Sequence, residues 1–318
     1  MTFARVLGTG GYLPERVVTN ADLEKLVDTQ DAWILERTGI RTRHIVSEGE
    51  TTCDLAERAS LQALEAAGID ASEIDLIVLG TTTPDLVYPA TACRLQARLG
   101  IHGCPAFDVQ AVCAGFIYAL GIADQFLRTG AATCALVVGA DANSKILDWA
   151  DRSTCVLFGD GAGAVLLKAS TKPGILSTHL HADGRYEHLL YVDGGVFHGY
   201  RQPAHVRMQG SEVFKVAVRT LGRIVDETLA ANNMDRCDVD WLVPHQANIR
   251  IITATAKLLG MPMERIILTI EEHGNTSAAS VPLAMDVAIR DGRIKRGDIL
   301  LLEAFGGGFT WGSALLKY

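Results

Sequence analysis

The sequence predicts an α/β protein of two domains. Strand-like and helix-like segments alternate along the whole chain, which is the pattern of layered α/β folds. With 318 residues the chain is long enough for two domains of about 150 residues each. Hydrophobic residues make up 48% of the chain and charged residues 21%, so it can bury a large core and is not disordered.

Apolar, β-branched runs that end in a turn residue predict buried strands, and longer segments of mixed polarity predict helices. In the first half these patterns predict strands at 75–80, 105–109, 133–139 and 162–168, and helices at 90–99 and 113–128. In the second half they predict helices at 211–231, 247–259 and 281–291, and strands at 241–244 and 298–303. The turn cluster Ser170–Gly174, which contains both proline and glycine, separates the halves. We therefore expect an N-terminal domain at 1–171 and a C-terminal domain at 172–318.

Composition and charge exclude several classes of protein. The chain has 29 Lys and Arg against 37 Asp and Glu, and this net charge of −8 argues against a protein that binds nucleic acid over its whole surface. The N-terminus, Met1–Val6, lacks the layout of a signal peptide, and the apolar stretch Ala111–Ala123 is too short to span a membrane. Seven cysteines without a CxxC pair argue against a zinc site and against a secreted disulfide framework. We therefore expect a cytoplasmic protein with reduced thiols and no metal.

Two reactive side chains each follow a predicted buried strand and stand near the start of a predicted helix. Cys113 is one, and a helix N-terminus favours the thiolate over the thiol. The small residues Ala114 and Gly115 leave room for a substrate at the sulfur. His245 is the other, directly after the predicted strand 241–244. The two halves therefore look alike in how they place a reactive residue, although a buried structural cysteine and a satisfied buried histidine are the alternatives.

Three further segments are weaker signals. Asn275 lies in a turn-prone cluster, where asparagine is common for conformational reasons alone. Gly306–Gly308 follows a predicted strand and is either a sharp bend or a place where backbone N–H groups approach a ligand closely. Gly159–Gly163 suggests a nucleotide-binding loop, but the GxGxxG pattern with a following acidic residue is not met there.

Taken together, these segments resemble one family over essentially the whole chain. The motifs occur in the order Val112–Phe116, Pro244–Asn248, His273–Ser280 and Phe305–Ser313, and are joined by Gly8–Pro14, Trp33–Arg41 and Leu157–Gly163. The chain resembles β-ketoacyl-acyl carrier protein synthase III, the initiating condensing enzyme of bacterial fatty acid synthesis.

The resemblance implies a fold and a reaction. The fold would be that of thiolases, with two similar α/β halves packed as five layers and usually present as a homodimer. The enzyme would be an acyltransferase that condenses acetyl-CoA with malonyl-acyl carrier protein, giving acetoacetyl-acyl carrier protein, CoA and CO₂ without a metal or redox cofactor. Cys113 would hold the acetyl group, and His245 and Asn275 would donate hydrogen bonds to the enolate oxygen. The backbone N–H groups of Cys113 and Gly307 would hold the oxyanion.

The resemblance also implies binding residues. Trp33, Arg37 and Arg152 match positions that bind the nucleotide end of CoA, and Asn248 matches one near the pantetheine arm. Lys215, Arg250 and Lys257 match basic positions that dock the acidic acyl carrier protein; Arg219 and Arg223 extend the same stripe. The ordinary alternatives are a surface ion pair for Arg37, a helix cap for Asn248 and solvated faces for the basic residues. Tyr88 matches a position that floors the acyl pocket of the partner subunit, which favours short, straight primers.

Related condensing enzymes are the nearest rivals. A degradative thiolase would need a second reactive cysteine near the C-terminus, but the last cysteine is Cys237. An elongating synthase would need two histidines where this chain has His245 and Asn275. Relatives that make quinolones, polyketide starters or hydroxymethylglutaryl-CoA are not separated by sequence, because pocket shape decides the substrate. A structural homologue without catalytic activity is the remaining alternative.

Overall fold

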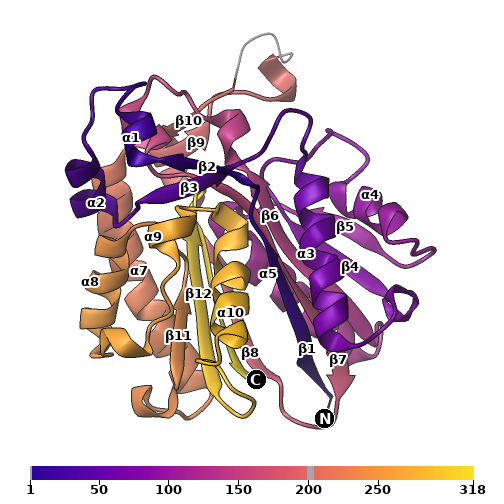
Figure 1. Ribbon diagram of the computed structural model, residues 1–318. Coiled ribbons are helices and arrows are strands. Elements are labelled where there is room, and N and C mark those ends of the chain that lie inside the picture. Colours follow the sequence, from indigo (N-terminus) through magenta and orange to yellow (C-terminus); the bar gives the residue numbers. More distant parts are fainter. Residues whose placement is uncertain (1, 199–203) are drawn as a thin grey trace.

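The computed structural model describes residues 2–198 and 204–318. Its two main β-sheets lie on either side of a layer of helices (Figure 1). The first sheet has five strands, in the spatial order β1 (Phe3–Tyr12), β7 (Asp160–Ser170), β6 (Cys134–Ala142), β4 (Leu76–Gly80) and β5 (Ala106–Val109). The second has four strands, in the order β11 (Trp241–Pro244), β12 (Ile299–Gly306), β13 (Thr310–Lys317) and β8 (Ile175–Ala182).

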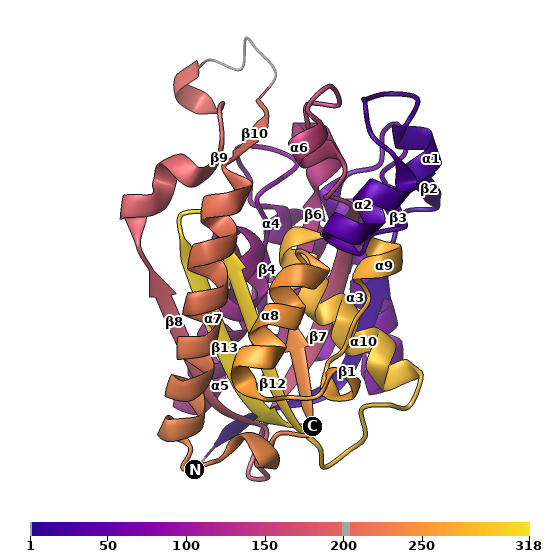
Figure 2. The same ribbon diagram turned by 90° about the vertical axis from the view of Figure 1, so that its left-hand side faces the viewer.

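Helices fill the space between the sheets and cover both outer faces. The central layer holds α5 (Gly115–Thr129) and α10 (Ser280–Arg290). The outer face of the first sheet is covered by α3 (Thr52–Ala67) and α4 (Thr91–Arg98), and that of the second by α7 (Gly210–Ala231) and α8 (Ile249–Leu259). The order from left to right in Figure 1 is therefore helix, sheet, helix, sheet, helix. Figure 2 shows α7 and α8 side by side on the face turned toward the viewer.

Shorter elements complete the chain. The remaining α-helices are α1 (Asn20–Leu23), α2 (Asp31–Thr38), α6 (Arg152–Cys155) and α9 (Ile270–His273). Two small ribbons pair β2 (Arg16–Thr19) with β3 (Thr42–Ile45) and β9 (Leu190–Val192) with β10 (Val206–Met208). The 3₁₀ helices are η1 (Ala71–Glu73), η2 (Val112–Ala114), η3 (Asn143–Ile146), η4 (Gly184–Leu189), η5 (Val196–His198), η6 (Arg236–Asp238), η7 (Met263–Arg265) and η8 (Ser277–Ala279).

The two sheets repeat one topology. In the first, β1 and β7 are antiparallel, β7 and β6 are antiparallel, and β6 and β4 are parallel. In the second, β8, β13, β12 and β11 follow each other with the same directions. Even the edge strand β5 has a trace of a counterpart, a parallel bridge between Leu242 and Ile266. The expected α/β class is confirmed; the division of the chain at 171 and 172 stays a prediction, and β7 and β8 end and begin on either side of it.

Glycines set the distance between helices and sheets. A β-carbon on Gly10 of β1 would lie 2.2 Å from the carbonyl oxygen of Ala59 in α3, so only glycine allows this approach. A β-carbon on Gly163 of β7 would lie 2.7 Å from Pro282 Cβ in α10. The glycines at 159–163 therefore serve close packing against the central layer, and the idea of a nucleotide-binding loop there is wrong.

Most residues of the two central helices, α5 and α10, are buried. Phe116 and Ile117 of α5 belong to one apolar cluster with Val243 of β11 and Met285 of α10, so the core runs through both halves. This explains why nine of the fifteen residues of α5 are buried, whereas Gln125 and Thr129 near its end are exposed. No helix among the described residues is long and apolar enough to cross a membrane.

Candidate active site

Cys113 lies where three elements meet. It follows β5 in the short helix η2, and Val112 before it has a left-handed backbone with φ of 50°. A β-carbon on Gly306, at the end of β12, would lie 2.6 Å from the Cys113 backbone nitrogen. The Thr310 hydroxyl donates to the Ala111 carbonyl at 2.7 Å and holds the Gly306–Gly308 turn against η2. The glycine turn therefore lies against the cysteine.

Burial controls the charge of Cys113. Its side chain is 5% exposed, and desolvation raises the pKa of the thiol to about 12. Desolvation therefore opposes the helix N-terminus, which we expect to favour the thiolate; Cys113 lies just before Gly115, the first residue of α5.

His245 directly follows β11 and is held at two places. Its backbone N–H donates to the Glu303 carbonyl at 2.8 Å, and its Nδ1 lies 2.6 Å from the Ser280 hydroxyl oxygen. Burial lowers the pKa of the imidazole to about 3, so it is neutral at physiological pH. A neutral imidazole can donate one hydrogen bond and accept another.

Asn275 is fixed through its backbone and its side-chain oxygen. Its N–H donates to Leu157 at 2.9 Å, and its carbonyl accepts from Gly159 at 3.0 Å. Its Oδ1 accepts the N–H of Ser277 at 2.9 Å. Because the oxygen is used in this way, the NH₂ group is the part of the amide that is left to donate to a substrate.

The start of α10 mirrors the start of α5. The short helices η8 and η2 both have three residues, and their first residues, Ser277 and Val112, have φ of 52° and 50°. The topological counterpart of Cys113 is therefore Ala278, and not His245 as the sequence suggested. Cys113 and His245 both follow a buried strand. However, the strand before His245, β11, corresponds to β4, whereas the strand before Cys113 is β5.

Asp141 holds the start of α10 and was missed from the sequence. This fully buried carboxylate, at the end of β6, accepts the N–H of Ala278 at 3.1 Å and the N–H of Thr82 at 2.7 Å. A β-carbon on Gly115 would lie 3.4 Å from Ala278 Cβ, so the two helix starts touch. Only the pairing of both halves reveals this role, because no local pattern marks Asp141.

A cavity of about 1130 Å³ opens beside Cys113. The cysteine, Val112 and Ser277 lie at its reactive end, and Phe158, Leu190 and Val206 give it an apolar wall. His245 and Asn275 do not line this cavity. They contact the start of α10 and the short helix before it, through Ser280 and Ser277. The cavity is thus suited to hold an apolar acyl chain attached to the sulfur.

The expected CoA-binding residues fall into two groups. The Arg152 guanidinium lies 4.9 Å from the centre of the Trp33 ring and donates to the Asp28 carbonyl at 2.8 Å. Arg37 is exposed on α2 and forms none of the ion pairs found in the described residues. The structure therefore brings Trp33 and Arg152 together and leaves Arg37 accessible nearby on the same helix as Trp33.

A buried arginine holds this region in place and was also missed. Arg43 is fully buried and donates to the Val156 carbonyl at 2.9 Å, at the end of α6, and to Asn20 Oδ1 at 2.9 Å. Asn20 in turn donates to Asp31, the first residue of α2. Arg43 thus links the helix that carries Arg152 to the helix that carries Trp33.

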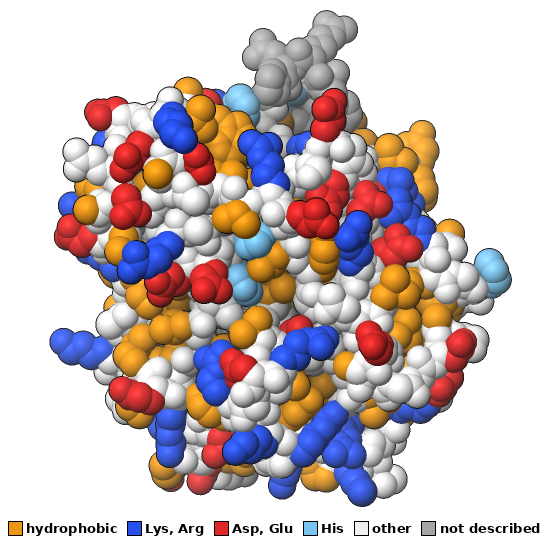
Figure 3. Space-filling view, in the orientation of Figure 1, with side chains coloured by type: hydrophobic (Ala, Val, Ile, Leu, Met, Phe, Trp, Pro, Cys, Tyr) orange, Lys and Arg blue, Asp and Glu red, His pale blue; other side chains and the backbone are white. Residues whose placement is uncertain are grey.

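Asn248 and the basic residues lie on the outer layer of the second half. Asn248 caps α8, since its side chain accepts the Arg250 N–H at 2.9 Å. Arg250 and Lys257 are exposed on α8, and Lys215 is exposed on α7, paired with Glu212 at 2.8 Å. On the face of the molecule drawn in Figure 3, acidic and basic side chains are intermixed.

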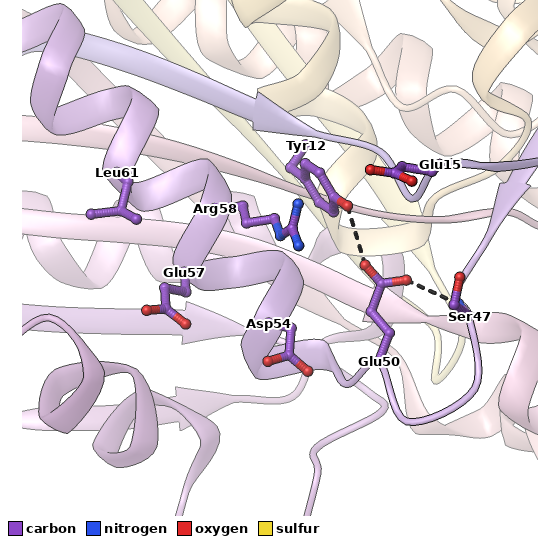
Figure 4. A pocket seen from close by; sticks show the side chains of 8 residues that line it. All are labelled: Tyr12, Glu15, Ser47, Glu50, Asp54, Glu57, Arg58 and Leu61. Atoms are coloured by element: carbon purple, nitrogen blue, oxygen red, sulfur yellow. Dashed lines mark hydrogen bonds between the residues drawn. The ribbon is translucent and has the colours of Figure 1, made fainter.

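A second hollow, of about 550 Å³, is separate from the cysteine (Figure 4). Three of its four carboxylates, all but the exposed Glu15, are paired with other side chains of the protein. Glu50 accepts from Tyr12, whereas Asp54 and Glu57 pair with Arg98. Among residues 2–198 and 204–318, no group of three or more His, Cys, Asp or Glu side chains could hold a metal ion.

Comparisons with known proteins agree with the geometry. The model of the 3-oxoacyl-[acyl-carrier-protein] synthase III family matches residues 107–184, and the model of its C-terminal part matches 229–318. The β-ketoacyl-[acyl-carrier-protein] synthase III of Thioalkalivibrio sulfidiphilus is 65% identical over 322 residues, covering 100% of both chains.

Solved structures agree as well. The 3-oxoacyl-[acyl-carrier-protein] synthase III of Aquifex aeolicus has a TM-score of 0.95 and 48% identity, covering 99% of this chain and 100% of its own. The priming β-ketosynthase of the R1128 polyketide pathway has a TM-score of 0.95 and 37% identity, covering 99% and 96%. The thiolase-like fold expected from the resemblance is confirmed. The chain belongs to the β-ketoacyl-acyl carrier protein synthase III family of condensing enzymes.

Proposed function

We propose that Cys113, His245 and Asn275 carry out the reaction of this chain. As a β-ketoacyl-acyl carrier protein synthase III, the enzyme condenses an acetyl group from acetyl-CoA with malonyl-acyl carrier protein. The observation that carries the proposal is the position of Cys113, against the Gly306–Gly308 turn and at the reactive end of an apolar cavity. Such a sulfur can accept an acyl group that the cavity then shelters from water.

The first half-reaction transfers acetyl to the enzyme. The Cys113 sulfur attacks the thioester carbonyl, the bond from that carbon to the CoA sulfur breaks, and the thiol proton of Cys113 ends on the departing CoA thiolate. The carbonyl oxygen becomes negative in the tetrahedral intermediate. Backbone N–H groups of Cys113 and Gly307 are the donors proposed to hold it; those in the first turn of a helix have no helical partner.

The second half-reaction forms the new carbon–carbon bond. The malonyl group loses CO₂, and the electron pair of the broken bond passes to an enolate oxygen. The proposed donors to that oxygen are the imidazole of His245, which its low pKa keeps neutral, and the NH₂ group of Asn275. The enolate carbon then attacks the acetyl carbonyl. When the intermediate collapses, Cys113 leaves as a thiolate and takes up a proton from water, and acetoacetyl-acyl carrier protein is released.

Mass spectrometry of the folded enzyme tests these roles. Incubation with acetyl-CoA should add one acetyl group, located on Cys113, and Cys113→Ser should add none. His245→Ala and Asn275→Ala should still accept the acetyl group but lose about 10²–10³-fold in condensation, the scale of one lost oxyanion donor. An unmodified Cys113, or variants that fail in acetylation and spare decarboxylation, would contradict the assignment.

The proposal extends to cofactors, location and assembly. The thiol, the imidazole, the amide and the backbone N–H groups supply every group that the two half-reactions need, so we propose that no metal or redox cofactor takes part. We also propose that the enzyme works in the cytoplasm. Assembly as a homodimer is supported by the exposed apolar segment Leu86–Tyr88, where Tyr88 is 84% exposed, and by the edge strand β5. Leu86 and Val87 lie at the rim of the cavity beside Cys113, so a second copy seated there would reach the acyl site.

A further inference from the structure

Ser280 is a buried serine in direct contact with His245. It is the first residue of α10 and is 1% exposed. Its hydroxyl oxygen lies 2.6 Å from His245 Nδ1 and accepts the backbone N–H of Gln246 at 3.3 Å. These are the polar contacts of this hydroxyl in the described part of the chain.

The two contacts decide where the hydroxyl proton goes. The Gln246 N–H can only donate, so it occupies a lone pair of the serine oxygen. If the second lone pair accepted from His245 Nδ1, the serine proton would have no acceptor among these contacts, so Nδ1 is taken to accept that proton. A nitrogen that accepts a hydrogen bond carries no proton itself, so the single ring proton of the neutral imidazole resides on Nε2.

We propose that Ser280 is a positioning residue that holds His245 in the tautomer with the proton on Nε2. This inference rests on the proposed role of His245 as a donor to the enolate oxygen. In the other tautomer Nε2 would present a lone pair, which cannot stabilise an anion. The serine therefore acts on the condensation through the imidazole and does not touch the substrate.

The surroundings keep the serine in place. Two residues earlier, the Ala278 N–H is held by the buried carboxylate of Asp141. Ala279, between them, is buried in the same turn. The hydroxyl therefore meets the imidazole from a helix start that is held elsewhere, and loss of the oxygen removes its contacts with His245 Nδ1 and with the Gln246 N–H.

Ser280→Ala tests the inference, with Ser60→Ala as the matched control. Ser60 is also fully buried on a helix, but its hydroxyl donates to Ala56 in α3, far along the chain from the site. Ser280→Ala should lower kcat for condensation about tenfold, the scale of one hydrogen bond, and leave KM and Cys113 acetylation by acetyl-CoA unchanged. Ser280→Thr keeps the hydroxyl and should restore most of the rate, whereas Ser60→Ala should leave kcat unchanged.

Nitrogen-15 NMR of the histidine ring shows which ring nitrogen of His245 carries the proton. The tautomer would not change if Ser280 acted only on folding. In the wild type, Nδ1 of His245 should be the unprotonated nitrogen, and in Ser280→Ala the two tautomers should mix. A protonated Nδ1 in the wild type would overturn the inference, and so would an unchanged tautomer and rate in Ser280→Ala. Equal losses in both half-reactions would assign Ser280 to folding alone. If His245→Ala leaves condensation intact, it is the proposed role of His245 that fails, whatever the tautomer.

Discussion

The guanidinium of Arg152 covers the ring of Trp33 at 4.9 Å, although the two residues belong to different helices. Arg152 is oriented by the Asp28 carbonyl and lies on α6, whose end is held by Arg43. We propose that this pair binds the nucleotide end of CoA, since the ring can stack on a base and the cation can pair with phosphate.

Trp33→Ala should therefore weaken the binding of acetyl-CoA. Stacking of a base on an aromatic side chain is worth about 1–3 kcal/mol, so KM for acetyl-CoA should rise at least about fivefold. KM for malonyl-acyl carrier protein should stay the same, and Trp33→Phe should lose less than Trp33→Ala. Steady-state kinetics with each substrate varied in turn checks this. Equal changes in both KM values would remove Trp33 from the nucleotide site.

Alkylation of Cys113 should depend on pH in a specific way. Because burial raises the pKa of this thiol to about 12, the thiolate fraction should grow about tenfold per pH unit between pH 7 and 9 without a plateau. Peptide mapping after timed treatment with iodoacetamide measures the rate. The exposed Cys237 reports in the same sample that the reagent is active. A plateau below pH 8 would show that the helix start activates the thiol after all.

Glu303 should make the protein less stable as the pH rises. Its carboxyl is buried, neither oxygen has a hydrogen-bond partner among the described residues, and desolvation raises its pKa from 4.5 to about 8. Between these values the unfolded chain has lost the proton that the folded chain keeps, so stability falls from about pH 4.5 to 8. The total loss is roughly 3–5 kcal/mol.

Glu303→Gln should remove this loss, because the amide has nearly the same shape and no charge. Its unfolding free energy in urea should exceed that of the wild type by an amount that grows from pH 5 to pH 8. Glu264→Gln, at an exposed position, is the control and should show no such trend. A constant difference between wild type and Glu303→Gln would mean that the carboxyl ionises in the native state at ordinary pH.

Arg250→Glu should impair docking of the acidic acyl carrier protein. Arg250 is exposed on α8 and lies beside α7, where Lys215 is also exposed. The KM for malonyl-acyl carrier protein should rise sharply and depend less on salt, while acetylation by acetyl-CoA changes little. Lys172→Glu makes the same charge change in the exposed turn between β7 and β8 and should have no effect. Similar losses in both half-reactions would place Arg250 in the substrate tunnel.

Primer choice should follow the size of residue 88. Tyr88 is exposed, and we propose that it reaches the acyl site of a second copy, where its bulk would limit the length of the acyl chain. The kcat/KM should therefore be highest for acetyl-CoA, lower for isobutyryl-CoA and lowest for octanoyl-CoA. Tyr88→Ala should reduce this discrimination, although one methylene is worth only about 1–3 kcal/mol. A wild-type preference for octanoyl-CoA would refute the assignment of Tyr88 and favour a larger starter unit.

Some elements were missed because their sequences carry weak local signals. Strand β1 (Phe3–Tyr12) is rich in glycine, which disfavours a strand locally but is required by the approach of α3. Helix α3 is different: it was not predicted, although the capping box at Thr51 and Asp54 marks its start in the sequence. Strands β8 and β13 were also not predicted, because their registers are fixed by each other and by β12.

The sequence by itself determined the α/β alternation, most buried strands and the family, and it singled out Cys113, His245 and Asn275 as candidate catalytic residues. These follow from local apolar runs and from motifs that are contiguous in the chain. Only the tertiary structure decided the charge state of Cys113, the counterpart of the cysteine in the second half, and the contacts of Ser280, Asp141 and Arg43. Ser280 lies 35 residues from His245, and Asp141 lies 137 residues from Ala278. Desolvation and hydrogen bonding depend on which groups surround an atom in space, and separations of this length leave no trace in any local pattern.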